Sequence, residues 1–129
     1  MLSERDRRIL EAPNFASIAT AMPDGSPHVS TVWIDVDGDD VLVNTAEGLV
    51  KTANVRRDPR VSISVTDQQQ DPYEQVVIHG AVVDVTNDGA DEHIDRLAKK
   101  YLGVDEYPWR ESGERRLILR IRPDRVSQG

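Results

Sequence analysis

The sequence predicts a mainly β protein of the α+β class, in which six antiparallel strands close into a small barrel with two or three short helices. Three observations lead to this fold class. The length of 129 residues suits a single domain. Aromatic residues make up only 5% of the chain, so the core must be mainly aliphatic. Short β-forming stretches alternate with turn signals. We therefore expect one domain spanning residues 1–129.

The strand predictions follow from alternation and turn chemistry. Val61, Ile63 and Val65 alternate with hydroxyl residues, which indicates a strand with one buried face. The turn signal Asp37-Gly38-Asp39-Asp40 predicts that the second and third strands form an antiparallel hairpin. Gly80 lies among β-formers, where glycine marks a bulge or a close backbone approach. The six predicted strands are Phe15 to Ala21, His28 to Val36, Val41 to Thr45, Val61 to Thr66, Val76 to Val85 and Leu117 to Ile121, with Val126 extending the last beyond Pro123.

Three helices are predicted from capping signals and from apolar spacing. Ser3 and Asp6 resemble a capping box at the start of a short first helix. A second helix runs from Leu49 to Arg57 and ends before Asp58-Pro59. The third carries Ile94, Leu97, Ala98, Tyr101 and Leu102 at helical spacing, with Asn87 or Asp88 as its cap and Gly103 after its end.

Charge and composition exclude several classes of function. The net charge of -7 disfavours nucleic acid and anionic membrane as partners. Few aromatic residues and no basic face also disfavour an oligonucleotide-binding barrel. The chain has no cysteine, no signal-peptide pattern and no stretch long and apolar enough to span a membrane. We expect a cytoplasmic protein.

Neither a metal centre nor a hydrolytic site is predicted. His28, His79 and His93 lack metal-ligand spacing, and we interpret them as surface or hydrogen-bonded strand residues. The aspartates of the turn at 37–40 lack the spacing and the distal glutamate of a calcium loop.

The segment from Asn44 to Asn54 is the best candidate for a binding site. Asn44 and Thr45 end a strand just before a helix that carries Lys51. Helix N–H groups, the two polar side chains and the lysine could together bind a phosphate. The same residues also fit a solvent-exposed lysine on a surface helix, and the residues alone leave both interpretations open.

The order Val43-Asn44-Thr45, then Lys51 and Asn54, then Asp58-Pro59-Arg60-Val61-Ser62 resembles the core of the pyridoxamine 5′-phosphate oxidase-like, FMN-binding split barrels. The likeness implies a split barrel whose cofactor lies between the two chains of a homodimer. It also implies that one side of the cofactor site comes from the second strand and that Gln75 reaches the cofactor from the facing side. The implied cofactor-binding residues are Val29, Ser30, Thr31, Val32, Trp33, Ile34, Asn44, Thr45, Lys51 and Gln75.

Departures from the oxidase pattern refine the implied function. Leu49 and Val50 stand where the oxidase has an arginine before the lysine, and the oxidase's C-terminal substrate region has no counterpart after Gly129, so vitamin B6 oxidation is not expected.

Other motifs resemble a short branch of the superfamily that is associated with coenzyme F420. These motifs are Pro23 to Pro27, Arg56 to Val61, Lys100 to Gly103 and Tyr107-Pro108. The resemblance implies an F420H2-dependent reductase that transfers hydride to an electrophilic double bond of a small organic substrate. The catalytic residues stay unknown. An FMN-dependent oxidoreductase and a noncatalytic protein that binds a flavin, a deazaflavin or haem are the alternatives.

Two further groups of residues are candidates for ligand contacts. Trp33 and Trp109 could shape the substrate side, or be core residues. Arg56, Arg57 and Arg60 could meet the acidic tail of F420, or be ordinary charges near a helix end.

Overall fold

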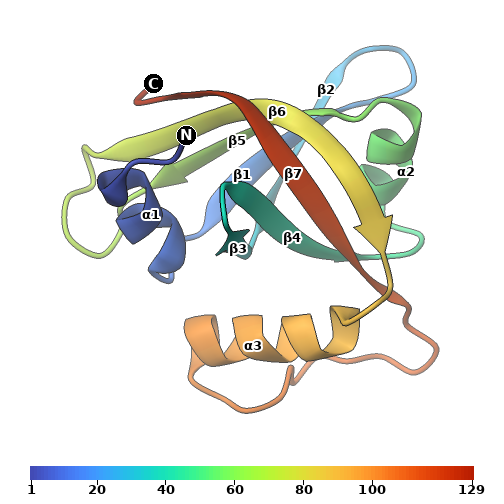
Figure 1. Ribbon diagram of the computed structural model, residues 1–129. Coiled ribbons are helices and arrows are strands. Elements are labelled where there is room, and N and C mark those ends of the chain that lie inside the picture. Colours follow the sequence, from blue (N-terminus) through green and yellow to red (C-terminus); the bar gives the residue numbers. More distant parts are fainter.

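The computed structural model describes residues 1–129 and confirms a mainly β, α+β fold (Figure 1). All neighbouring strands in the sheet are antiparallel, in the order β2-β1-β5-β6-β7-β4-β3. The sheet curls into a half-barrel, with α3 lying along one side of it. The elements are α1 (Glu4–Glu11), β1 (Ala16–Ala21), β2 (Pro27–Val32), β3 (Ile34–Asp37), β4 (Asp40–Ala46), α2 (Val50–Arg57), β5 (Arg60–Thr66), β6 (Gln75–Thr86), α3 (Ala90–Leu102) and β7 (Arg116–Ser127).

The sheet has seven strands, so the prediction of six was wrong. The predicted second strand, His28 to Val36, is broken at Trp33 into β2 and β3. β2 pairs with β1, whereas β3 pairs with β4 through the predicted hairpin. The break arises because the two halves lie at opposite edges of the sheet.

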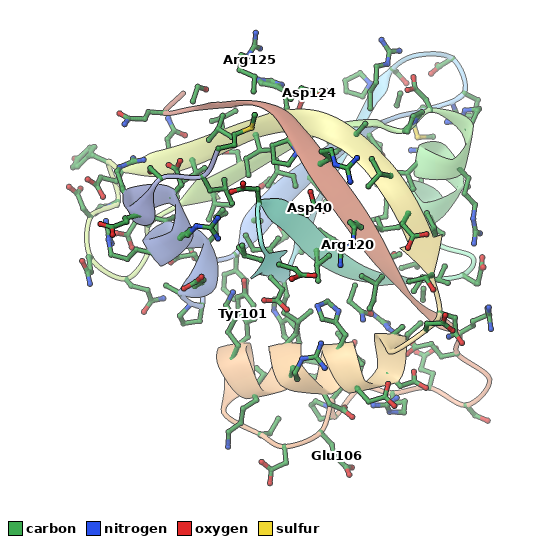
Figure 2. All side chains as sticks on the ribbon, in the orientation of Figure 1. Asp40, Tyr101, Glu106, Arg120, Asp124 and Arg125 are labelled. Atoms are coloured by element: carbon green, nitrogen blue, oxygen red, sulfur yellow. The ribbon has the colours of Figure 1, made fainter.

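One residue joins these two edges, and this connection forces the sheet to curl. A single residue spans only about 3.5 Å, so the end of β2 and the start of β3 must lie together. Side chains of α3 bind the backbone there: the Ile34 N–H donates to the Tyr101 hydroxyl at 3.2 Å, and Lys100 Nζ donates to the Ile34 carbonyl at 2.7 Å. Figure 2 shows Tyr101 projecting from α3 toward the strands.

The two longest strands, β6 and β7, are bent where the sequence predicted an irregularity. The register between them shifts at His79/Gly80, where Gly80 lies opposite Pro123. A Cβ atom on Gly80 would overlap the carbonyl oxygen of Arg122, which explains the need for glycine. Proline is tolerated because the bulge removes the need for a regular ladder hydrogen bond. β7 therefore continues through Pro123 to Ser127, as the extension to Val126 required.

The core is aliphatic and closed by α1. Ile9 and Leu10 of this helix are fully buried against strand residues such as Ile63 and Ile121. The capping box of Ser3 and Asp6 is present, and its two reciprocal hydrogen bonds fix the start of α1.

The predicted cap of the third helix was wrong. α3 begins after Gly89, which has a positive φ of 73° and no side-chain cap. Asn87 instead donates its amide to the Arg116 carbonyl, which ties the start of α3 to β7. Gly103 ends the helix with a φ of 74°, as expected. None of the three helices has the length and apolar character that a membrane crossing requires.

Candidate functional site

A cavity of about 290 Å³ lies where the β2–β3 junction faces α3 and the loop that precedes β7. Strand β4 and the first turn of α2 form another wall. The residues that line the cavity are Phe15, Thr31, Val32, Trp33, Asn44, Thr45, Leu49, Lys51, Ile94, Leu97, Tyr107, Trp109 and Arg116. The cavity therefore has both an aromatic region and a cationic region.

Aromatic rings gather on one side of the cavity. Trp33 stacks on Tyr101 with ring centroids 5.1 Å apart and an interplanar angle of 5°. Tyr107 meets Trp33 edge-on at 6.0 Å, and Trp109 lies tilted at 6.2 Å. Phe15 stacks on Tyr101 at 5.8 Å. Such a surface favours planar conjugated ligands.

Two cations form the other end of the cavity. Lys51, in the first turn of α2, is half-buried and has no hydrogen bond or ion pair within the chain. Burial, and secondarily the nearby charge of Arg116, lower the pKa of Lys51. Arg116 is buried; its Nε donates to Asn44 Oδ1 at 2.8 Å and its Nη1 lies 3.3 Å from Glu114. An anion bound between the two cations would offset their repulsion and the cost of burial.

The predicted donors Asn44 and Thr45 line the cavity, but their hydrogen atoms are already used. The Asn44 amide donates to the Ala90 carbonyl at 2.9 Å and to His93 Nδ1 at 3.1 Å. Thr52 donates its hydroxyl hydrogen to the Ala46 carbonyl, so Thr45 is the donor in the 3.0 Å contact between the two threonines. These side chains therefore support the wall, and the cations are left to meet a phosphate.

The structure brings together six of the ten predicted cofactor residues: Thr31, Val32, Trp33, Asn44, Thr45 and Lys51. The other four lie elsewhere in this chain. Val29 is 65% exposed on the outer sheet face, and Ile34 is fully buried in the core. The Ser30 hydroxyl is buried without a partner. Gln75 lies beside α1, where its carbonyl accepts from Arg5.

The three arginines predicted near a cofactor tail differ in their contacts. Arg56 is paired with Glu47 through two hydrogen bonds, and Arg60 with Asp58. Arg57 instead donates to the Ala21 carbonyl and to Asn54 Oδ1 at 2.8 Å. Arg57 is therefore the one of the three without a carboxylate partner.

Sequence reasoning missed Arg116 and misassigned His93. Arg116 comes just before the predicted strand Leu117 to Ile121 and is the first residue of β7, and nothing local indicates that it lines the same cavity as Lys51. His93 was interpreted as a surface or strand residue, yet it is fully buried in α3. The burial of His93 on the apolar face of this helix could have been predicted from the sequence. Ala90, His93, Ile94 and Leu97 continue the apolar i, i+3, i+4, i+7 spacing one turn upstream.

Comparison with known proteins identifies the family. The family model described as pyridoxamine 5′-phosphate oxidase matches residues 2–128, which is almost the whole chain. The chain therefore belongs to the pyridoxamine 5′-phosphate oxidase family and has its oxidoreductase-type fold, as the resemblance predicted. No curated protein matches the chain.

Solved structures have the same fold. The chain is similar to a structure described as an F420 reductase, with 29% identity, a TM-score of 0.84 and coverage of 95% of this chain and 96% of that one. A conserved hypothetical protein of Mycobacterium tuberculosis has 24% identity and a TM-score of 0.72, over 98% and 83% of the two chains. HupZ of Group A Streptococcus shares the fold at 15% identity, with a TM-score of 0.69 over 98% of each chain.

Removal of the Lys51 ammonium should weaken binding of a phosphate-bearing cofactor. We expect Lys51→Ala to cost about 1.5–3 kcal/mol of binding free energy, the scale of a charge-assisted hydrogen bond. Lys51→Met, which keeps the aliphatic stem, should behave similarly, and the melting temperature of the free protein should change little. Fluorescence titration measures the affinity; equal affinity of wild type and both variants at low salt would place the phosphate elsewhere.

The stability of the fold should depend on pH through Lys100. Burial lowers the pKa of Lys100 to about 8. Between pH 8 and its ordinary value of 10.5, the unfolded chain holds this proton and the folded chain does not, so the residue's contribution to stability rises with pH. We expect the free energy of unfolding of wild type, relative to Lys100→Met, to increase above pH 8 in urea denaturation. A constant or decreasing difference would contradict this.

Proposed function

We propose that this protein is an F420H2-dependent reductase that delivers hydride to an electrophilic double bond of a small organic substrate. The observation that carries the proposal is one cavity with stacked aromatic rings at one end and an unpaired Lys51 beside Arg116 at the other. A deazaflavin with a ribityl phosphate has the matching parts. The similarity to an F420 reductase over 95% of the chain supports this choice.

The chain's own residues would bind, orient and enclose the cofactor rather than react with the substrate. Lys51 and Arg116 would hold the phosphate, while Thr31, Val32 and Trp33 would lie against the ring system. Tyr107 and Trp109, on the loop before β7, would exclude water from the substrate side. When bound, the cofactor supplies the hydride, so no protein nucleophile is required.

A second cavity offers a place for the acidic tail of F420. It has a volume of about 350 Å³, runs along α2, and shares Leu49 with the first cavity. Arg56 and Arg57 both line it, but the charge of Arg56 is neutralised by Glu47. We therefore propose Arg57 as the main tail contact.

FMN is the second candidate cofactor, and one observation favours it. Leu49 and Val50 replace the arginine that precedes the lysine in the oxidase, which counts mildly against FMN, yet Arg116 supplies a second cation from β7. The phosphate end therefore suits either cofactor. A noncatalytic flavin, deazaflavin or haem carrier would use the same residues, and turnover assays separate it from a reductase.

The outer face of β1, β2 and β5 supports the proposal of a homodimer. Arg60 is the only Lys, Arg, Asp or Glu residue in these three strands, whereas such residues make up 30% of the chain. The sequence led us to expect that the Val-rich predicted strands His28 to Val36 and Val76 to Val85 would leave apolar surface exposed. Val29 and Val83 are exposed, whereas Val76 is buried. The outer face of β1, β2 and β5 exposes serine residues and Val29. A neutral, small-residue face suits close packing of a second sheet.

The cavity lies beside this face. Thr31, which lines the cavity, is in register with Ser17 of β1, and Ser17 with Ser64 of β5. Gln75 of β6 pairs with Thr66, which is two residues along β5 from Ser64, so Gln75 lies across the strands from β2. We propose that two copies pair through this face, so that Gln75 of one chain reaches the cavity of the other.

Cofactor choice can be tested by titrating the free protein with F420 and with FMN at two salt concentrations. We expect tighter binding of F420, and a loss of that affinity with rising salt because the tail contact is electrostatic. Arg57→Gln should weaken F420 binding by about tenfold and leave FMN binding unchanged. Arg122→Gln is the matched control, because Arg122 is an exposed arginine of β7 that faces Asp40. Tighter binding of FMN, or F420 affinity insensitive to salt and to Arg57, would favour the FMN alternative.

Turnover decides between a reductase and a carrier. We expect oxidation of reduced F420 when enones, quinones or tetrapyrroles are supplied, measured by the return of its absorbance. Tight binding without turnover across this panel would indicate a carrier.

The homodimer can be tested by sedimentation at micromolar concentration. Val29 is 65% exposed on the proposed interface, so Val29→Asp should convert dimer to monomer by burying an unpaired charge. Val83→Asp is the matched control, since Val83 is 44% exposed on β6, outside this face. A monomeric wild type that still binds cofactor fully would contradict the proposal.

A further inference from the structure

A chain of buried polar contacts leads from β3 to the cationic end of the cavity. Asp35 Oδ2 lies 3.2 Å from His93 Nε2, and His93 Nδ1 lies 3.1 Å from the Asn44 amide nitrogen. Asn44 Oδ1 then accepts from Arg116 Nε at 2.8 Å. His93 has no exposed surface, and it does not line the cavity.

The chemistry of these groups defines the donor and the acceptor in each of the three contacts between Asp35 and Arg116. The Asn44 amide nitrogen is a donor only, so His93 Nδ1 must accept. The neutral imidazole then carries its proton on Nε2 and donates it to Asp35. The bond from His93 is the largest cause of the lowered pKa of Asp35, which is consistent with a carboxylate at that end.

His93 fixes the plane of the Asn44 amide. The terminal torsion of asparagine is broad, so one hydrogen bond leaves the amide free to rock about it. Here the two N–H bonds are held separately, by the Ala90 carbonyl and by His93. The carbonyl oxygen of the amide is thereby held in the direction from which Arg116 Nε donates.

Arg116 needs this acceptor because it is the only hydrogen bond that its side chain makes. The terminal nitrogens form none within the chain, although Nη1 is 3.3 Å from Glu114. The guanidinium carbon lies 5.3 Å from the centroid of the Tyr107 ring. Nε therefore helps to orient the group. Nη1 forms an ion pair with Glu114, and Nη2, which has no partner within the chain, is left to meet an anion beside Lys51.

We propose that His93 is a positioning residue for anion binding, which acts through Asn44 to aim Arg116 at the phosphate of the bound cofactor. The proposal rests on the proposed function only in the assumption that the cavity binds a phosphate-bearing ligand. His93 itself touches no ligand.

The test uses FMN and riboflavin, which differ only in the phosphate. The phosphate preference is the dissociation constant of riboflavin divided by that of FMN. General damage to the fold would change both constants alike and leave this ratio unchanged. We expect His93→Leu to reduce this ratio by about tenfold, the scale of one hydrogen bond. His93→Gln keeps one acceptor and one donor and should restore most of the ratio. Ile78→Val is the control, a core change away from the cavity.

Double variants show whether the effect passes through Arg116. In an Arg116→Met background, His93→Leu should change the ratio no further. In a Lys51→Met background, His93→Leu should still reduce the ratio. A reduction in the Arg116→Met background, or an unchanged ratio in His93→Leu, would overturn the positioning role even if F420 binds. A wild type that lacks phosphate preference would overturn it as well. A wild type that binds FMN but not F420, with the expected pattern of ratios, would support the positioning role and refute the F420 function.

Discussion

The short connection between β2 and β3 is the constraint on which the rest of the structure depends. One residue, Trp33, carries the chain from one edge of the sheet to the other, so the sheet cannot lie flat. The backbone at this point has lost regular ladder partners, and unpaired polar groups in a core are costly. Lys100 and Tyr101 of α3 supply the missing partners. These two hydrogen bonds attach helix α3 to the junction, and the cavity is lined by residues of both.

The electrostatics of the chain make the cavity stand out. The net charge is -7, and most of the cationic side chains are paired with carboxylates on the surface. Arg120, for example, pairs with Asp37 and also with Asp40, which lies near it in Figure 2. Of the three lysines, Lys99 faces Asp105 and Lys100 binds two carbonyl groups, which leaves Lys51 alone without a partner. Lys51 is half-buried next to Arg116, whose own partner is Glu114, and a bound anion would relieve the cost of leaving Lys51 unpaired.

Features encoded by neighbouring residues could be predicted from the sequence. The capping box of α1 and the hairpin at Gly38 depend on local backbone geometry, and both are present. The bulge at Gly80 is present too; a glycine among β-formers signals it, although the close approach that requires the glycine comes from Arg122. The break at Trp33 could not be predicted, because the residues that stabilise it follow more than sixty positions later.

The sequence placed the candidate site near the cavity but did not indicate what its polar side chains contact. Polar residues at the end of β4 and the lysine of α2 line the cavity. Whether Asn44 and Thr45 face a ligand or a neighbour depends on α3 and α2 packing against them, which no local pattern encodes. Arg116 enters from β7 for the same reason. The sequence shows that it is charged but not which residue it meets.

The aromatic cluster gives the protein a built-in optical reporter. Trp33 and Trp109 are the only tryptophans of the chain, and both line the same cavity, 6.2 Å apart. Tryptophan emission from this protein therefore originates at the candidate site and at no other point of the fold. A change in that emission reports a change around the cavity, and unfolding of the distant β6–β7 bend would go unseen unless it also disturbed these two rings.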